Sequence, residues 1–333
     1  MRSRSCVVLG ALSLLLLFGG CRQATPRFLQ RWLSEPAWQW SDAHVLERVN
    51  AVRAGRSLQP KQWPGGARVA VLLSFDVDNE TLALASGKPT IGTLSDGEFG
   101  ARVGLGRVVN LLDRHAIPAT FFVPAMSLKL HPEMAGVIRA SGRHEIGVHG
   151  WIHEGPSSLS AEAERDLLGR AVDHLTKVTG KRPAGYRAPA LDFGPHTLAV
   201  LRSLGIEYDS SLMADDRPYE LLALGQPTGI VELPVSWILD DFVLLNPRAE
   251  TQSAPRDLLQ VWIDEYDRAY DEGTAFVLIL HPHVIGRRSR MVVLEALVDH
   301  IEAKGGAWFA TLGQGAEYVR QQAGLQAPPA SAE

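Results

Sequence analysis

The chain has 333 residues, of which 46% are hydrophobic and 21% are charged. This composition is typical of a globular protein and excludes a disordered, collagenous or multi-span membrane protein. The 33 Lys and Arg residues against 37 Asp and Glu residues give a net charge of -4. No surplus of positive charge is available for a nucleic-acid backbone, so nucleic acid is not an expected partner. We expect one large domain, or at most two.

Both cysteines, Cys6 and Cys21, lie within the first 21 residues. The rest of the chain carries no thiol, which excludes a cysteine nucleophile, a cysteine-ligated zinc and an internal disulfide there. Any metal must therefore be held by His and carboxylate side chains.

The first 21 residues have the pattern of an export signal. Arg2 and Arg4 precede an apolar run over residues 7–18, which is too short to span a bilayer comfortably. Residues 17–21 resemble a bacterial lipobox, in which the residue corresponding to Cys21 is acylated after cleavage. We expect residues 1–20 to be a lipoprotein signal peptide, and the protein to be exported and lipid-anchored to the cell envelope, facing the periplasm or the cell exterior. An uncleaved anchor or a simple secretory signal is the alternative.

Residues 21–62 are rich in Arg, Trp and Pro and are predicted to be a linker. Within them, valines at helical spacing predict a docking helix over residues 41–54. Residues 63–320 are predicted to form the main domain. The Ala- and Pro-rich residues 321–333 are predicted to be a disordered tail.

Beyond residue 68, short apolar runs alternate with amphipathic segments, which predicts strand-helix repeats and a mainly parallel sheet. The predicted strands cover residues 69–75, 119–123, 145–149, 185–188, 206–208, 231–235, 275–281 and 307–311. The predicted helices cover residues 105–115, 132–140, 161–178, 195–204, 256–271 and 290–303. The pattern favours an α/β fold, a distorted (β/α) barrel with seven or eight parallel strands. An open doubly wound sheet is the competitor, but no Gly-rich phosphate-binding pattern follows the first strand.

Two carboxylates follow the first predicted strand. Asp76 and Asp78 project to one face because strand side chains alternate, and they repel each other unless a cation separates them. A calcium-binding EF-hand loop would have Gly at its sixth position and Glu at its twelfth. The chain has Thr81 and Gly87 there, so this alternative fails.

Two histidines stand at the end of the third predicted strand. His149 and His153 are spaced so that both imidazoles reach one point. Together with Asp78 they make a ligand set suited to zinc, or to cobalt or another divalent first-row ion, with positions left open for water and substrate. Arg187 and His281 stand at two further strand ends, where the chemistry of a (β/α) barrel collects.

At these residues the chain resembles the polysaccharide deacetylase family, carbohydrate esterase family 4, from about residue 63 to residue 311. The first motif appears at 74–78 as Ser-Phe-Asp-Val-Asp, a form like that of certain peptidoglycan deacetylases and the metal-independent allantoinase-like hydrolases. The other four motifs match residues 149–153, 187–189, 234–241 and 281–290.

The resemblance implies a role for each motif residue. Asp76 is the expected general base and His281 the expected general acid. The expected metal ligands are Asp78, His149 and His153.

Further roles follow from the same resemblance. Arg187 is expected to pair with the base and keep it ionised and oriented, while Asp240 or Asp241 orients the acid. A backbone N–H near Ala190 is expected to stabilise an oxyanion. Ala190 itself departs from the aromatic residue usual in the family. Trp151 and Trp237 are candidates for stacking on a sugar ring or lining a smaller pocket, with core packing as the alternative for either.

The leading hypothesis is an exported metal-dependent hydrolase that removes N-acetyl groups from a cell-wall or extracellular polysaccharide. An allantoinase-like hydrolase of a small cyclic amide or ureide is the second reading, although export argues against it. A lipid-tethered carbohydrate-binding protein without turnover is the third.

Overall fold

The computed structural model describes residues 36–245 and 253–326. The predicted signal peptide with Cys21, and most of the predicted tail, lie outside the described residues. The chain divides into two units, residues 1–47 and 48–333, and the larger unit carries the whole sheet. Within the described ranges, no helix combines the length and the apolar character needed to cross a membrane.

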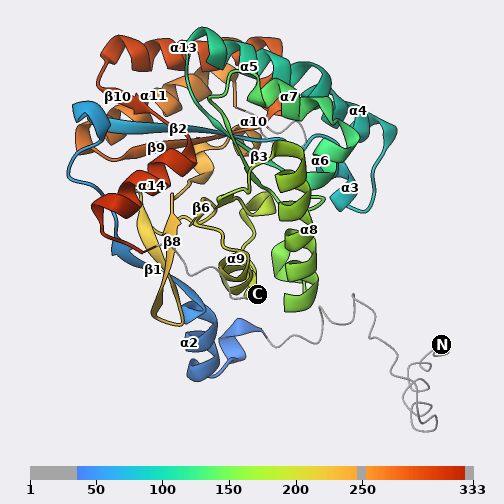
Figure 1. The fold of residues 1–333 in the computed structure, drawn as a ribbon, viewed down its shortest axis with the longest axis vertical. Helices are drawn as coiled ribbons and strands as arrows, with labels where there is room; N and C mark the ends of the chain where they lie inside the picture. The colour runs from blue at the N-terminus through green and yellow to red at the C-terminus, as the bar shows by residue number, and fades with distance from the viewer. Residues whose placement is uncertain (1–35, 246–252, 327–333) are drawn as a thin grey trace, which may run out of the picture. The chain divides into compact units, whose positions relative to one another are not determined.

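Ten strands form one curled sheet in the order β1-β7-β8-β6-β5-β4-β3-β2-β10, and β9 also pairs with β2 (Figure 1). β7 runs antiparallel to β1 and β8. β8 also pairs in parallel with β6, so eight of the ten strands, all except β1 and β7, have a parallel partner. The strands are β1 (Val52–Ser57), β2 (Val69–Asp76), β3 (Thr120–Val123), β4 (Glu145–Val148), β5 (Gly185–Tyr186), β6 (Tyr208–Asp209), β7 (Tyr219–Ala223), β8 (Gln226–Glu232), β9 (Ala275–Leu280) and β10 (Ala307–Phe309).

The eight parallel strands confirm the predicted distorted (β/α) barrel. A parallel bridge between Asp240 and Ile279 links the segment after β8 to β9. The curled sheet therefore approaches closure at the carboxyl ends of its strands.

Helices connect the strands, and α5, α7, α8, α11 and α13 share one large apolar core with the sheet. The helices are α2 (Asp42–Asn50), α3 (Thr81–Ala85), α4 (Ile91–Phe99), α5 (Leu105–Arg114), α6 (Ala125–Leu130), α7 (Glu133–Arg139), α8 (Ala161–Thr179), α9 (Thr197–Ser203), α10 (Asp241–Leu245), α11 (Pro255–Glu272), α12 (Pro282–Ile285), α13 (Arg288–Lys304) and α14 (Leu312–Gln322). Short 3-10 turns occupy Ala37–Gln39, Pro64–Gly66, Pro156–Ser158, Pro189–Leu191 and Trp237–Leu239, and a π-helical turn, Gly100–Gly104, joins α4 to α5.

The predicted helix over residues 41–54 is wrong at its end. α2 stops at Asn50, and Val52 begins β1, which pairs with β7. Gly55 allows this pairing, because a Cβ there would lie 2.7 Å from the carbonyl oxygen of Glu220. The sheet thus begins inside the segment predicted to be a linker, and neither β1 nor β7 was predicted.

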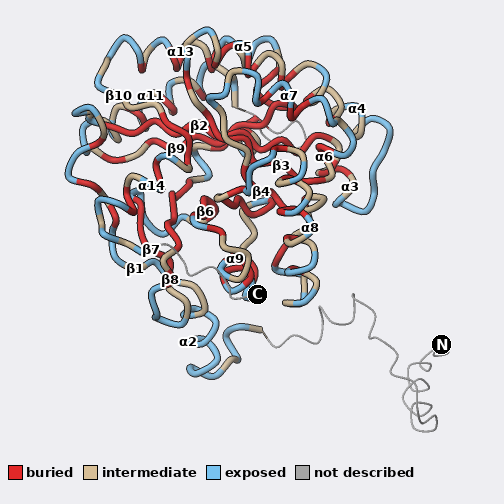
Figure 2. Tube along the Cα trace, in the orientation of Figure 1, coloured by how far each residue is buried: buried red, intermediate tan, exposed pale blue. Residues whose placement is uncertain are grey.

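The central strand β2 is buried along its whole length (Figure 2). Its odd-numbered side chains belong to the core beneath the outer helices. Its even-numbered side chains Ala70 and Leu72 belong to a second core, which they share with α14. Ser74 and Asp76 continue this even-numbered series, so alternation carries it from apolar packing to a buried carboxylate at the end of the strand.

Candidate active site

The carboxylates of Asp76 and Asp78 are both buried at the carboxyl end of β2. Asp78 lies just beyond the strand, and its backbone carbonyl accepts hydrogen bonds from the hydroxyls of Thr81 and Ser127. These bonds fix the turn after β2. The last residue of β2 therefore positions the Asp76 carboxylate, and the hydrogen-bonded turn after the strand positions the Asp78 carboxylate.

The loop after β4 brings two imidazoles together. Gly150 and His153 both have positive φ values, 75° and 65°, which turn the chain back on itself. The ring centroids of His149 and His153 lie 5.2 Å apart as a result.

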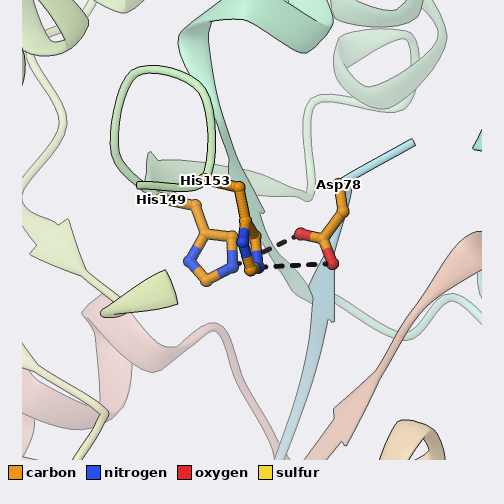
Figure 3. A group of neighbouring side chains, drawn as sticks. All are labelled: Asp78, His149 and His153. Carbon is orange, nitrogen blue, oxygen red and sulfur yellow. Dashed lines mark ion pairs between the residues drawn. The ribbon is translucent and has the colours of Figure 1, made fainter. Parts of the chain in front are cut away.

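Both imidazoles face Asp78 (Figure 3). His149 Nε2 lies 3.3 Å from Asp78 Oδ1, and His153 Nε2 lies 3.7 Å from Asp78 Oδ2. Among the described residues, Asp78 Oδ1 accepts no hydrogen bond although it is buried. A buried carboxylate that has one oxygen without a hydrogen bond, and whose two oxygens each face an imidazole nitrogen, fits a divalent cation.

Hydrogen bonding fixes the tautomer of His149. Its Nδ1 lies 2.8 Å from the backbone carbonyl oxygen of Arg187, which only accepts hydrogen bonds. Nδ1 therefore carries a proton, and Nε2 is the nitrogen that faces Asp78. Such a backbone contact on the far nitrogen is the usual support of a metal-binding histidine.

Burial and the nearby carboxylates act in opposite directions on the pKa values of the two histidines. Burial lowers the pKa of His153, which favours the neutral imidazole that binds metals. Burial also acts to lower the pKa of His149, but Asp76 and Asp78 outweigh it and raise that pKa above its usual value. Burial acts to raise the pKa of Asp78, yet His153 and His149 hold it well below its ordinary range.

Arg187 links the Asp76 carboxylate by hydrogen bonds to Ser74 and Ser210. Its Nη1 donates to Asp76 Oδ1 at 3.3 Å and to Oδ2 at 3.4 Å, while Nη2 donates to the hydroxyls of Ser74 and Ser210 at 3.2 and 2.9 Å. The guanidinium is fully buried, so these contacts hold it firmly. It in turn orients the Asp76 carboxylate.

His281 follows β9 and is held by Asp241. Its Nδ1 lies 2.7 Å from Asp241 Oδ1, and its backbone N–H donates to Asp241 Oδ2 at 3.1 Å. Asp240 lies farther from Nδ1, at 3.8 Å, and accepts a hydrogen bond from the Phe242 backbone. Of the two acids left open by the sequence, Asp241 is the one hydrogen-bonded to the imidazole, whereas Asp240 faces the cavity.

Neighbouring carboxylates favour the protonated, positively charged form of His281. Burial acts to lower its pKa, but Asp241, Asp240 and Asp78 outweigh burial and raise the pKa to about 10. Its Nε2 lies 3.8 Å from Asp78 Oδ2, on the side away from Asp241. Burial raises the pKa of Asp240 to about 6.

These side chains line one cavity of about 300 Å³. Ala190 and Trp237 line it too, and Trp237 is 49% exposed. Trp151 does not line it; its ring packs against Arg170, whose Cζ lies 4.2 Å from the ring centroid. The full lining is Asp76, Asp78, Leu82, His149, His153, Ala190, Leu191, Trp237, Asp240, Phe242, Val243 and His281.

Four apolar residues of this lining were not predicted from the sequence: Leu82, Leu191, Phe242 and Val243. Two of them carry a sequence signal, because Leu191 and Phe242 directly follow predicted site residues. Leu82 and Val243 carry none, since single apolar residues beside a motif are ordinary core candidates.

The helical stretch from α4 through α5 packs against two loops of the site. A Cβ on Gly97 would lie 2.4 Å from the Asn79 backbone, next to Asp78. A Cβ on Gly104 would lie 2.0 Å from the carbonyl oxygen of Pro282, next to His281. Glycine at these two positions permits the close approach of helix and loops.

This arrangement defines a hydrolase site on a (β/α) barrel, and comparison with known proteins agrees. Residues 88–208 match the polysaccharide deacetylase family model. A peptidoglycan deacetylase of Helicobacter pylori is 31% identical over 277 residues, which cover 73% of this chain and 94% of that protein.

Solved structures share the fold. A Mycobacterium smegmatis protein assigned to the polysaccharide deacetylases is 36% identical, with a TM-score of 0.73 over 84% of this chain and 99% of its own. Puue allantoinase, 24% identical, has a TM-score of 0.69 over 80% of this chain and 94% of its own, which shows the shared fold. The chain belongs to the polysaccharide deacetylase family, hydrolases that act on the amide bond of N-acetyl groups.

Proposed function

We propose that this protein is a metal-dependent deacetylase that removes N-acetyl groups from a cell-wall or extracellular polysaccharide. The observation that carries the proposal is the convergence of Asp78, His149 and His153 with Asp76 and His281 around one cavity. The similarity to the Helicobacter pylori peptidoglycan deacetylase supports N-acetylated peptidoglycan as the first substrate to test.

The proposed metal ligands are Asp78, His149 and His153, and zinc is the ion that best suits two imidazoles and one carboxylate. A divalent ion held by these three side chains would supply Lewis-acid polarisation of the acetamide carbonyl and would activate water. The three side chains contribute the buried carboxylate charge and two nitrogen donors. The Arg187 carbonyl holds one of these donors in the correct tautomer.

Asp76 is the proposed general base. Its carboxylate lines the cavity, and Arg187 holds it by two hydrogen bonds, so the carboxylate needs little reorganisation to accept a proton from the attacking water. A backbone N–H near Ala190 is the proposed oxyanion donor, because Ala190 lines the same cavity.

His281 is the proposed general acid. Asp241 accepts from Nδ1, and the neighbouring carboxylates of Asp241 and Asp240 outweigh burial and raise the pKa of the ring, which favours its protonated form. Nε2 therefore carries the proton on the side of Asp78, where the amine leaves. Asp241 is the proposed residue that orients the acid, and Asp240 adds negative charge beside it.

The test is acetate release from N-acetylated peptidoglycan and other acetylated glycans, together with metal content after dialysis. We expect near-stoichiometric zinc and acetate release, both lost in Asp78→Ala. Glu162→Ala, which removes an exposed carboxylate on α8, serves as the control. Full activity of Asp78→Ala, or turnover of a cyclic ureide without acetate release from any glycan, would overturn the proposal.

We propose further that the protein is exported and lipid-anchored to the cell envelope through Cys21. The support is the charged and apolar pattern of residues 2–18 followed by the lipobox-like residues 17–21. Labelling with a radioactive fatty acid tests this: the label should appear in the membrane fraction and disappear in Cys21→Ser. An unlabelled, freely soluble protein would contradict it.

A further inference from the structure

The five-residue turn from His149 to His153 contains no helix or strand. His153 itself adopts a φ of 65°, a left-handed conformation that a residue with a side chain rarely takes without local support. The turn therefore needs contacts that hold it in this shape.

Two backbone hydrogen bonds hold the outside of the turn, from Ala125 N–H to the Gly150 carbonyl at 3.1 Å and from Met126 N–H to the Trp151 carbonyl at 2.8 Å. Glu154 makes the side-chain contacts on the inside. Its Oε1 accepts from the Trp151 backbone N–H at 2.8 Å, and its Oε2 accepts from the Ile152 backbone N–H at 2.7 Å. Trp151 N also lies 3.1 Å from Oε2. The carboxylate thus fills the inside of the turn. Gly150 leaves room for it, since a Cβ there would lie 3.0 Å from Glu154 Oε1.

The two proposed metal-binding histidines are held in different ways. The His149 ring is anchored directly by the Arg187 carbonyl. Within residues 36–245 and 253–326, neither ring nitrogen of His153 is hydrogen-bonded to the backbone carbonyl of another residue. The position of its Nε2, 3.7 Å from Asp78, depends on the backbone of the turn.

We propose that Glu154 is a positioning residue for the metal centre, whose carboxylate holds the turn so that His153 faces Asp78. The inference rests on the proposed metal site. Glu154 acts through the two backbone N–H groups that it binds, and charge-assisted hydrogen bonds of this type are stronger than neutral ones. Residues that orient metal ligands typically change metal affinity by tenfold or more when they are removed.

Zinc affinity, measured by competition with a chelating dye, tests the inference on the full chain. Glu154→Ala should weaken zinc binding by about 10-fold to 100-fold. Glu154→Gln keeps one acceptor oxygen and should lose less. Glu162→Ala, the matched control on an exposed surface, should bind zinc as the unaltered protein does.

Two further measurements separate the outcomes. The visible spectrum of the cobalt-loaded protein should change in Glu154→Ala if His153 leaves the coordination sphere, whereas a purely structural role would lower the melting temperature of the metal-free protein alone. If Glu154→Ala does not fold, Glu154→Gln decides the question. Unchanged zinc affinity in a folded variant would overturn the inference. Failure of the unaltered protein to bind zinc would instead overturn the metal centre, and the inference with it.

Discussion

The interior face of β2 buries apolar side chains near the start of the strand and polar or charged side chains near its end. Near the start of the strand, Ala70 and Leu72 pack with α14 in an apolar cluster. At its end, Ser74, Asp76 and then Asp78 are just as buried but are hydrogen-bonded or paired with charged groups. Both halves share one strand and one alternation, so the difference lies in the side chains and their partners.

This contrast separates stability from chemistry along the strand. Apolar burial at the start stabilises the fold in proportion to the area removed from water. Buried carboxylates at the end cost free energy unless partners compensate, and such groups are typical of functional sites. Substitutions at the start of the strand should therefore lower the free energy of unfolding, whereas substitutions at its end should lower kcat.

The largest expected effect is at the polar end. Asp76→Asn removes the proposed base while Asn keeps the size of the side chain, so kcat should fall by about 10²-fold to 10⁴-fold. Zinc content should stay close to that of the unaltered protein, because Asp76 is not a proposed ligand. Steady-state kinetics and elemental analysis measure the two quantities.

Asp78→Asn serves as the comparison for Asp76→Asn, since it should lose zinc as well as activity. Near-normal turnover by Asp76→Asn would contradict the assignment of the base. Loss of zinc in Asp76→Asn would mean that Asp76 also contributes to metal binding, which contradicts its assignment as a base that is not a metal ligand.

The next effect belongs to the apolar end. Leu72→Ala leaves a gap beside α14 and should lower the free energy of unfolding by about 2–5 kcal/mol. The kcat of the folded protein should change little, because Leu72 does not line the cavity. Urea unfolding gives the first value and kinetics at low temperature the second.

Leu224, which is 69% exposed, provides the control. Leu224→Ala should change stability by less than about 0.5 kcal/mol. A large fall in kcat for Leu72→Ala at full occupancy of the folded state would show that the two halves of the interior are coupled.

A smaller effect is expected where the π-helical turn Gly100–Gly104 meets α12, which begins directly after His281. Gly104→Ala places a Cβ against the Pro282 carbonyl, which should cost about 1–3 kcal/mol and reduce kcat by displacing His281. Gly106 lies two residues further along in open space, so Gly106→Ala should stabilise α5 by about 0.5–1 kcal/mol. Thermal unfolding and kcat distinguish the pair, and equal effects of the two substitutions would contradict the close approach.

The sequence predicted β2, β3 and β9 well because their burial on both faces produces continuous apolar runs. It placed β8 at residues 231–235, whereas the strand begins at the exposed Gln226 and ends at Glu232. β2 is buried at all eight positions and was predicted to within one residue. β1 and β7 were missed for the opposite reason. β1 is mostly exposed and contains Arg53, Gly55 and Arg56, so only its pairing with β7 makes it a strand.

The candidate site was predicted where its residues end strands, since strand ends meet at one edge of a barrel. The sequence left open which acid contacts His281, because Asp240 and Asp241 are neighbours and only the backbone conformation decides between them. Glu154 gave no signal, since an acidic residue after a motif is ordinary in a loop. Its role depends on two backbone N–H groups that a sequence does not display.

The smallest expected effect concerns the buried acid Glu232. Glu232 on β8 is fully buried, and burial together with the nearby charge of Asp209 raises its pKa well above the usual value. Its Oε1 accepts from the backbone N–H groups of Ser211 and Leu212. Since Ser210 in the same turn contacts Arg187, this acid helps to build the polar end of the interior.

The sign of the pH effect follows from that raised pKa. The folded protein holds the proton more tightly than the unfolded chain, so the stabilisation is complete below the unfolded pKa and is lost as the pH rises toward the folded pKa. Glu232→Gln keeps an acceptor oxygen and cannot titrate. The variant should therefore gain stability relative to the parent as the pH rises from about 5 to about 8. Urea unfolding at several pH values measures this difference, with the exposed Glu162→Gln as control; a difference that stays constant with pH would mean that Glu232 is ionised in the folded protein.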